Sequence, residues 1–146
     1  MTKRPKTDPL HLEIVRAREA QRVWVDAWSA PLGTSFDDVA RRAGLEPLGD
    51  QWETLGRAAA VDLLALLLHR DLAYSGIAAP ATQARELAEG FVGSFGPEEC
   101  RYATNRPLRG GRFAPSWNPA TSFTFDAGVI VVGRERAGVL WVADED

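Results

Sequence analysis

The residues best able to do chemistry lie near the end of this sequence of 146 residues. Residues 122–132 are largely apolar and β-branched, residues 133–138 form a short polar loop, and residues 139–142 are again apolar. Two such segments around a short polar loop predict a β-hairpin. The carboxylates of this hairpin belong to Asp126, Asp144, Glu145 and Asp146.

The expected strand register brings these carboxylates together. If residues 133–138 are the loop, Val132 lies near Val139 and Asp126 lies near Glu145. Like charges opposite each other on neighbouring strands destabilise a sheet by up to ~1 kcal/mol per pair. The pattern therefore predicts one acidic patch that a cation compensates.

Three sources of that cation stay open. The first is internal, because no acid occurs between Cys100 and Phe125 whereas several arginines do. The second is a partner protein with a basic surface. The third is a divalent metal such as Mg²⁺, which takes oxygen ligands from carboxylates. The internal arginines are Arg101, Arg106, Arg109 and Arg112.

Aromatic residues add a second candidate contact. The segments 129–132 and 139–142 do not alternate in polarity, so both faces of these strands must be covered. Either the loop 105–120 covers the second face or another chain does. Tryptophan is enriched at the centre of protein interfaces, so Trp117 and Trp141 are candidate contacts, although each also suits a core. Glu135, in the hairpin loop, completes the candidate partner-binding residues.

No catalytic constellation is complete. Residues 69–72 match the start of a protein-kinase catalytic loop, but the asparagine that should follow is absent. Asp126 with Glu135 is similar to the acidic site of some nucleases, except that Ala137 stands where a lysine is required. His11, His69 and Cys100 show no metal-ligand spacing. We expect no catalytic residue, no metal ligand and no cofactor.

Hydrophobic periodicity predicts helices first and strands last. We expect helices over residues 9–29, 36–43, 50–73 and 80–94, then a short strand over 100–104 and a strand over 122–132 that is kinked or bulged at Gly128. The expected fold class is α+β, in which about four N-terminal helices pack with a small C-terminal antiparallel β-hairpin or a three- to four-stranded sheet. Residues 1–7 are expected to be a flexible basic tail, and residues 8–146 a single domain.

The composition indicates the cellular compartment and excludes some classes of binding partner. The formal net charge of −3 gives no general attraction to nucleic acid or to anionic membranes. The single cysteine fits a reducing compartment. The longest apolar stretch, 58–68, is far shorter than the ~20 residues of a membrane span. These observations predict a cytoplasmic protein with no membrane contact and no direct nucleic-acid contact.

The C-terminal segment resembles a known class of protein. Residues 116–119 (Ser-Trp-Asn-Pro), 124–132 (Thr-Phe-Asp-Ala-Gly-Val-Ile-Val-Val) and 138–146 (Gly-Val-Leu-Trp-Val-Ala-Asp-Glu-Asp) carry the likeness. They resemble the C-terminal end of small bacterial immunity proteins, the partners of secreted toxins. The resemblance implies a cytoplasmic antidote without catalytic activity that binds one cognate toxin, whose cleft we expect to be basic.

The sequence alone leaves two alternatives to this function. One is a structural or regulatory domain that self-associates, as a homodimer, through the apolar hairpin face. The other is a metal-dependent hydrolase that uses the same acids. The contact with a partner could lie at the hairpin or at the loop 105–120.

Overall fold

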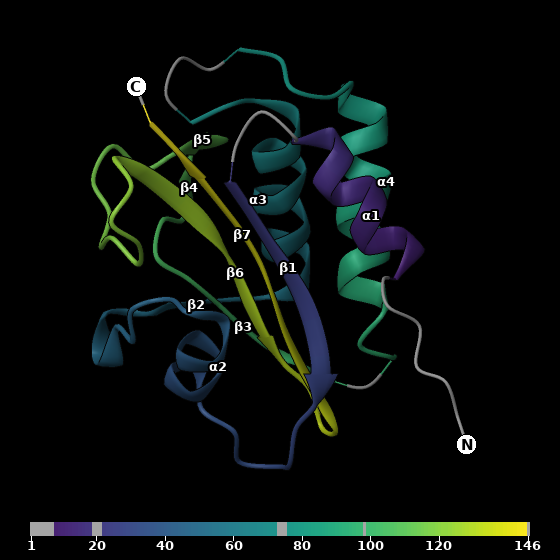
Figure 1. Ribbon diagram of the computed structural model, residues 1–146, viewed down its shortest axis with the longest axis vertical. Coiled ribbons are helices and arrows are strands. Elements are labelled where there is room, and N and C mark those ends of the chain that lie inside the picture. Colours follow the sequence, from purple (N-terminus) through teal and green to yellow (C-terminus); the bar gives the residue numbers. More distant parts are fainter. Residues whose placement is uncertain (1–7, 19–21, 73–75, 98, 146) are drawn as a thin grey trace.

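A computed structural model describes residues 8–18, 22–72, 76–97 and 99–145 (Figure 1). The predicted flexible tail, residues 1–7, lies outside the described residues. The helices among the described residues are α1 (Pro9–Ala17), α2 (Phe36–Ala43), the 3-10 helix η1 (Gly49–Gln51), α3 (Arg57–His69) and α4 (Ala81–Gly93). The strands are β1 (Arg22–Ser29), β2 (Glu53–Leu55), β3 (Arg101–Thr104), β4 (Leu108–Arg109), β5 (Arg112–Phe113), β6 (Phe125–Val132) and β7 (Arg136–Asp144).

The described residues build one five-stranded antiparallel sheet and one small hairpin. The sheet has the order β1-β7-β6-β3-β2, and β4 pairs with β5 separately. Helices α1, α3 and α4 cover one face of the large sheet, and α2 lies on the other face (Figure 1). Both faces of the central strands are therefore covered by the chain itself.

The predicted fold class is wrong in the size and origin of its sheet. The sheet has five strands, and β1 and β2 come from segments that we expected to be helical. The predicted helix 9–29 ends at Ala17. Trp24 and Trp28 misled the prediction because a spacing of four residues fits both one helical face and one strand face. Helices and strands therefore alternate along the first half of the chain.

The predicted helix 50–73 is also too long. Its first part is η1 followed by β2, which pairs with β3, and α3 begins only after Gly56. The predictions of α2, α4 and β3 are confirmed to within one residue at each end. In α2, Ser35 and Asp38 form the capping box that their spacing predicts, with hydrogen bonds of 3.0 Å in both directions.

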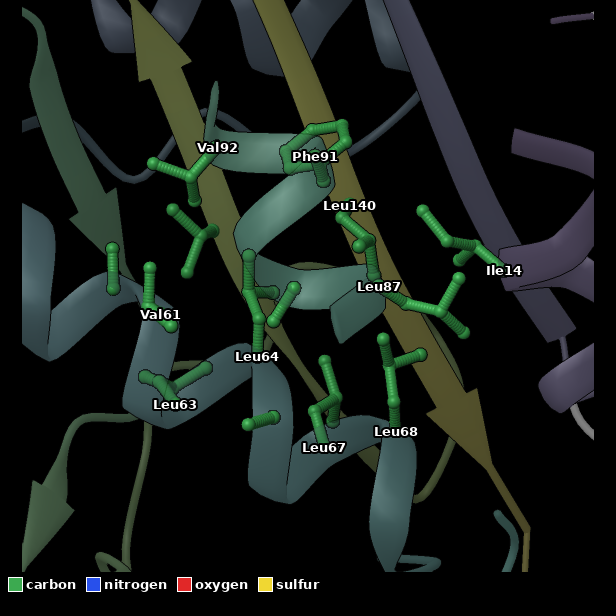
Figure 2. Packing of buried hydrophobic residues seen from close by; sticks show 14 of the residues in the cluster. Ile14, Val61, Leu63, Leu64, Leu67, Leu68, Leu87, Phe91, Val92 and Leu140 are labelled. Carbon is green, nitrogen blue, oxygen red and sulfur yellow. The ribbon is translucent and has the colours of Figure 1, made fainter. Parts of the chain in front are cut away.

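Two hydrophobic cores lie on opposite faces of the sheet. The larger core joins α1, α3 and α4 to β6 and β7, and α3 is buried around much of its circumference. In Figure 2 the side chains of α3 and α4 meet Ile14 of α1 and Leu140 of β7. The smaller core lies beneath α2 and contains Val39, Val139 and Trp141.

The hairpin forms, but in a different register from the predicted one. Val132 pairs with Ala137, and Asp126 pairs with Ala143, because β7 starts at Arg136 inside the expected loop. The ladder pairs residues one to one through Gly128, so the predicted bulge there is wrong.

Candidate functional site

The predicted acidic patch does not form. Asp126 pairs with Ala143, one residue before Asp144, and successive residues of a strand point to opposite faces. Asp126 therefore lies on the α2 face, whereas Asp144 lies on the face of α1 and α3. Glu145 is exposed and accepts a hydrogen bond from Thr124 Oγ1. Asp146 lies outside the described residues.

Asp126 is fully buried and bound by neutral donors. Its side chain accepts hydrogen bonds from Asn105 Nδ2 at 2.7 Å, Thr121 Oγ1 at 2.9 Å and Trp141 Nε1 at 3.2 Å. The backbone N–H groups of Ala120 and Thr121 also donate to it, each at 3.2 Å. A carboxylate with this set of donors organises the loop before β6 against β7. Arg106, one of the predicted arginines, does not donate a hydrogen bond to it, but burial lowers the pKa of the Arg106 guanidinium and the Asp126 charge opposes that shift.

Asp144 has an internal cation, but a different one from those predicted. Nη2 of Arg18 lies 3.2 Å from the Asp144 carboxylate, and both side chains are buried. The backbone N–H of Leu72 donates to the same carboxylate at 2.6 Å. Burial lowers the pKa of the Arg18 guanidinium, and the neighbouring Asp144 opposes that shift. The pair ties the end of α1 to the end of β7.

The remaining predicted contact residues lie in different environments. Trp141 is fully buried and packs edge-on against Trp52, with ring centroids 6.1 Å apart. Trp117 is partly buried and stacks on Phe125 at 5.8 Å. Glu135 is exposed in the hairpin turn. Of the predicted contact residues within the described part of the chain, Glu135 and Glu145 are therefore the exposed ones.

A groove lies between the C-terminal half of α3 and the β4–β5 hairpin. It consists of two hollows of about 500 and 400 Å³, which share Leu66 and Gly111 in their walls. Its first hollow, which we call the arginine hollow, is lined by Leu66, Arg70, Asp71, Leu72, Arg106, Gly111, Arg112 and Phe113. The loop 105–120 contributes Arg106, Leu108, Gly111, Arg112 and Phe113 to the walls of the groove.

The outer side of β1 is a second candidate site. Ala30 N donates to Glu135 O, so this residue pair is hydrogen-bonded, and such pairs recur at every second residue of an antiparallel ladder. The outward backbone groups are therefore those of Val23, Val25, Ala27 and Ser29, and of these the Ala27 N–H already donates to Asp26 Oδ1 at 2.8 Å. Among the described strands, only β7 pairs with β1.

Aromatic and cationic side chains accompany this edge. Trp24 and Trp28 are partly buried on the α2 face, and Trp24 packs edge-on against Phe123 at 6.3 Å. The guanidinium of Arg42 lies 4.4 Å from the centre of the Trp28 ring, and that of Arg22 lies 5.3 Å from the Phe123 ring. We call these five residues, together with the outward backbone of β1, the β1 edge surface.

Sequence reasoning missed the β1 edge surface because it assigned both tryptophans to the interior of a helix. The signal that could have found it is the run Val23-Trp24-Val25, which is made of β-branched and aromatic residues that favour strands.

Other expectations can be compared with the described part of the chain. It contains no group of three or more His, Cys, Asp or Glu side chains that could hold a metal ion. None of its helices has the length and hydropathy of a membrane span. Comparison with family models, curated proteins and solved structures finds no match to this chain.

Proposed function

We propose that this protein is a cytoplasmic immunity protein that neutralises one cognate bacterial toxin domain by stoichiometric binding, with no catalytic role of its own. The β1 edge surface is the observation that carries the proposal, because it combines an unpaired strand edge with aromatic and arginine side chains. The resemblance of the C-terminal segment to immunity proteins supplies the kind of partner.

The residues behind that resemblance form the framework of the fold. Asp126 organises the loop before β6, Trp141 fills the smaller core, and Asp144 closes the pair with Arg18. Buried framework residues can be shared by proteins whose partners differ. The proposed contact therefore moves from the acidic hairpin to a surface that faces solvent, and the expectation of a basic toxin cleft has no further support.

The β1 edge surface suits a protein partner for two physical reasons. An extended segment of the partner can add to the outward N–H and C=O groups of β1, which is a common mode of recognition. Tryptophan and arginine supply much of the binding energy in protein interfaces. Leu32, just beyond β1 in the sequence, is 82% exposed and adds an apolar side chain that a partner at β1 could contact.

The test uses the protein encoded by the neighbouring gene as the candidate toxin. We expect the two proteins to co-purify, and Trp28→Ala and Leu32→Lys each to weaken binding at least about tenfold. Ile77→Lys is the matched control, because Ile77 is also exposed, at 69%, but lies beyond the opposite end of β1, near the Arg70 backbone that Arg18 contacts. If all three variants bind equally well, the β1 edge surface is not the contact. If the two proteins do not co-purify, the product of the neighbouring gene is not the partner.

Self-association is the second candidate function, and the same unpaired edge favours it, because two copies of β1 can pair across a twofold axis. The measurement is the molecular mass in solution over a range of protein concentrations without the partner. A monomer at every concentration contradicts self-association, whereas a dimer that Leu32→Lys dissociates supports it.

A further inference from the structure

The wall of the arginine hollow is rich in arginine. Arg70, Arg106 and Arg112 line it together with Asp71, and the charge of the nearby Asp126 also acts on Arg106. The carboxylate, Asp71, accepts a hydrogen bond from the Gly76 backbone at 2.9 Å. Leu66, Leu72 and Phe113 supply apolar wall between the charges. A volume of about 500 Å³ is in the range of small-molecule sites.

Arg106 is the unusual member of this wall. It is only 9% exposed, yet among the described residues its Nη1 has no hydrogen-bond acceptor. Its Nε donates to Ala114 O at 2.7 Å, and its guanidinium lies 4.0 Å from the Trp117 ring centre and 5.4 Å from that of Phe113. The side chain is therefore held in place while part of its donor capacity is unused.

A second buried donor without a hydrogen-bond acceptor lies next to Arg106. Nε1 of Trp117 is buried and also has no acceptor within the described part of the chain. A buried N–H without an acceptor is costly, and the cost is larger for a charged group. Arg106 lines the hollow and Trp117 does not, so the unsatisfied donor in the wall is cationic and favours an acceptor that carries negative charge.

We propose that the arginine hollow binds a small organic oxyanion, either a phosphate ester or a carboxylate, whose charged group lies between Arg106 and Arg112 and whose apolar part contacts Phe113 and Leu66. Guanidinium groups suit this role because their planar donors match the geometry of both oxyanions. The aromatic wall favours a ligand with a flat or apolar body over a bare inorganic ion. This site is separate from the β1 edge surface and does not depend on the proposed toxin.

The first test follows the Trp117 indole N–H by nuclear magnetic resonance while a ligand is titrated at low ionic strength. The probes are phenyl phosphate and benzoate, with inorganic phosphate to test the contribution of the ring and benzyl alcohol as the neutral counterpart. We expect saturable shifts with at least one aromatic oxyanion. Binding of phenyl phosphate alone identifies a phosphate site, and binding of benzoate alone a carboxylate site. The absence of saturable shifts, or equal shifts with benzyl alcohol, overturns the proposal.

The second test compares two arginines of the same hairpin. Arg112 lines the hollow, whereas Arg109 does not and pairs instead with Glu53 at 3.2 Å. Arg112→Ala should weaken binding of the preferred probe about tenfold, because it removes a charge-assisted contact. Arg109→Ala makes the same change in net charge and should leave affinity unaltered. If both variants weaken binding equally, the anion is attracted only by the overall positive charge of this surface and not by the hollow. That result overturns the proposal.

A variant of Arg106 itself tests the geometry. Arg106→Lys keeps the charge but loses the planar donors, so it should weaken binding by at least as much as Arg112→Ala. If this variant binds with unaltered affinity, Arg106 does not hold the ligand and the proposed site is wrong. The hydrogen bond from Arg106 Nε to Ala114 O makes some loss of stability possible, so the dispersed indole signals of the unliganded variant serve as the check of its fold.

Discussion

Two buried carboxylates on neighbouring strands are stabilised by different means. Asp126 accepts hydrogen bonds from neutral donors, whereas Asp144 pairs with the Arg18 guanidinium. The acids of the hairpin could be predicted from the sequence, and the opposite faces of Asp126 and Asp144 follow from strand alternation, which the prediction of a single patch overlooked. Their partners could not be predicted, because Asn105 and Arg18 come from distant segments. The observed register differs from the predicted one by two residues, an even number, so each side chain keeps its face and only its partner on the neighbouring strand changes.

Breaking the ion pair of Arg18 with Asp144 should destabilise the protein more when one partner is removed than when both are replaced by apolar residues. Asp144→Ala leaves Arg18 buried without its counter-charge and should lower the free energy of unfolding by about 3–5 kcal/mol. Arg18→Met combined with Asp144→Leu should cost less than the sum of the single changes, because no charge stays buried alone. Chemical denaturation of the four proteins in this double-mutant cycle measures the coupling.

The exposed pair of Arg85 with Asp62 is the control for that cycle. Its atoms are closer, at 2.9 Å, but both side chains are about half exposed. Asp62→Ala should therefore change stability by less than about 1 kcal/mol. A similar loss for Asp62→Ala and Asp144→Ala would mean that burial does not set the strength of these pairs.

At the scale of elements, the segments with local signals were predicted in kind, although the bounds of α3 and the register of the hairpin were wrong. The capping residues of α2, the apolar surface of α3 and the two strands of the hairpin all depend on neighbours in the sequence. The two strands predicted as helix, β1 and β2, depend on distant partners. β1 pairs with β7, and β2 pairs with β3. In β1 the residues Val23, Trp24 and Val25 themselves favour a strand, and the β1 edge surface was missed because the spacing of Trp24 and Trp28 was assigned to a helix.

Gly128 shows how the hairpin admits its central tryptophan. It pairs with Trp141, and a Cβ at this position would lie 2.5 Å from the indole Cε3 and 2.3 Å from Leu140 O. The absence of a side chain, and not a bulge, is what the site requires. The backbone oxygen cannot move away without disturbing the β6–β7 ladder.

Gly128→Ala should therefore destabilise the fold by about 3 kcal/mol, since both the indole and the ladder must shift. Gly93→Ala is the matched control, because its added Cβ would meet only Arg57 Nη2 at an ordinary 3.8 Å in the last turn of α4. That change should be neutral or stabilising. Thermal unfolding followed by circular dichroism separates the two outcomes, and a Gly128→Ala variant as stable as the parent would contradict the packing described for Trp141.

At the scale of the molecule, one sheet separates two cores whose unfolding can be followed by different spectroscopic signals. Trp24, Trp28, Trp52 and Trp141 belong to the smaller core, whereas most of the helical residues pack on the larger one. The smaller core thus dominates fluorescence, and the larger one dominates far-ultraviolet circular dichroism.

Because β6 and β7 contribute side chains to both cores, we expect one cooperative transition. The midpoints of denaturant unfolding followed by tryptophan fluorescence and by circular dichroism should coincide. A fluorescence midpoint at lower denaturant would mean that α2 and the smaller core open first, and the protein would then have two folding units.

The pairing of β1 with β7 also sets the order of events during synthesis. β1 emerges from the ribosome early, but its strand partner is the last strand that the described chain provides. At about 5–20 residues per second, the nascent chain spends several seconds with β1 unpaired and the apolar α3 without its sheet. The protein is therefore expected to complete its fold only after β7 has been made, and to depend on chaperones until then.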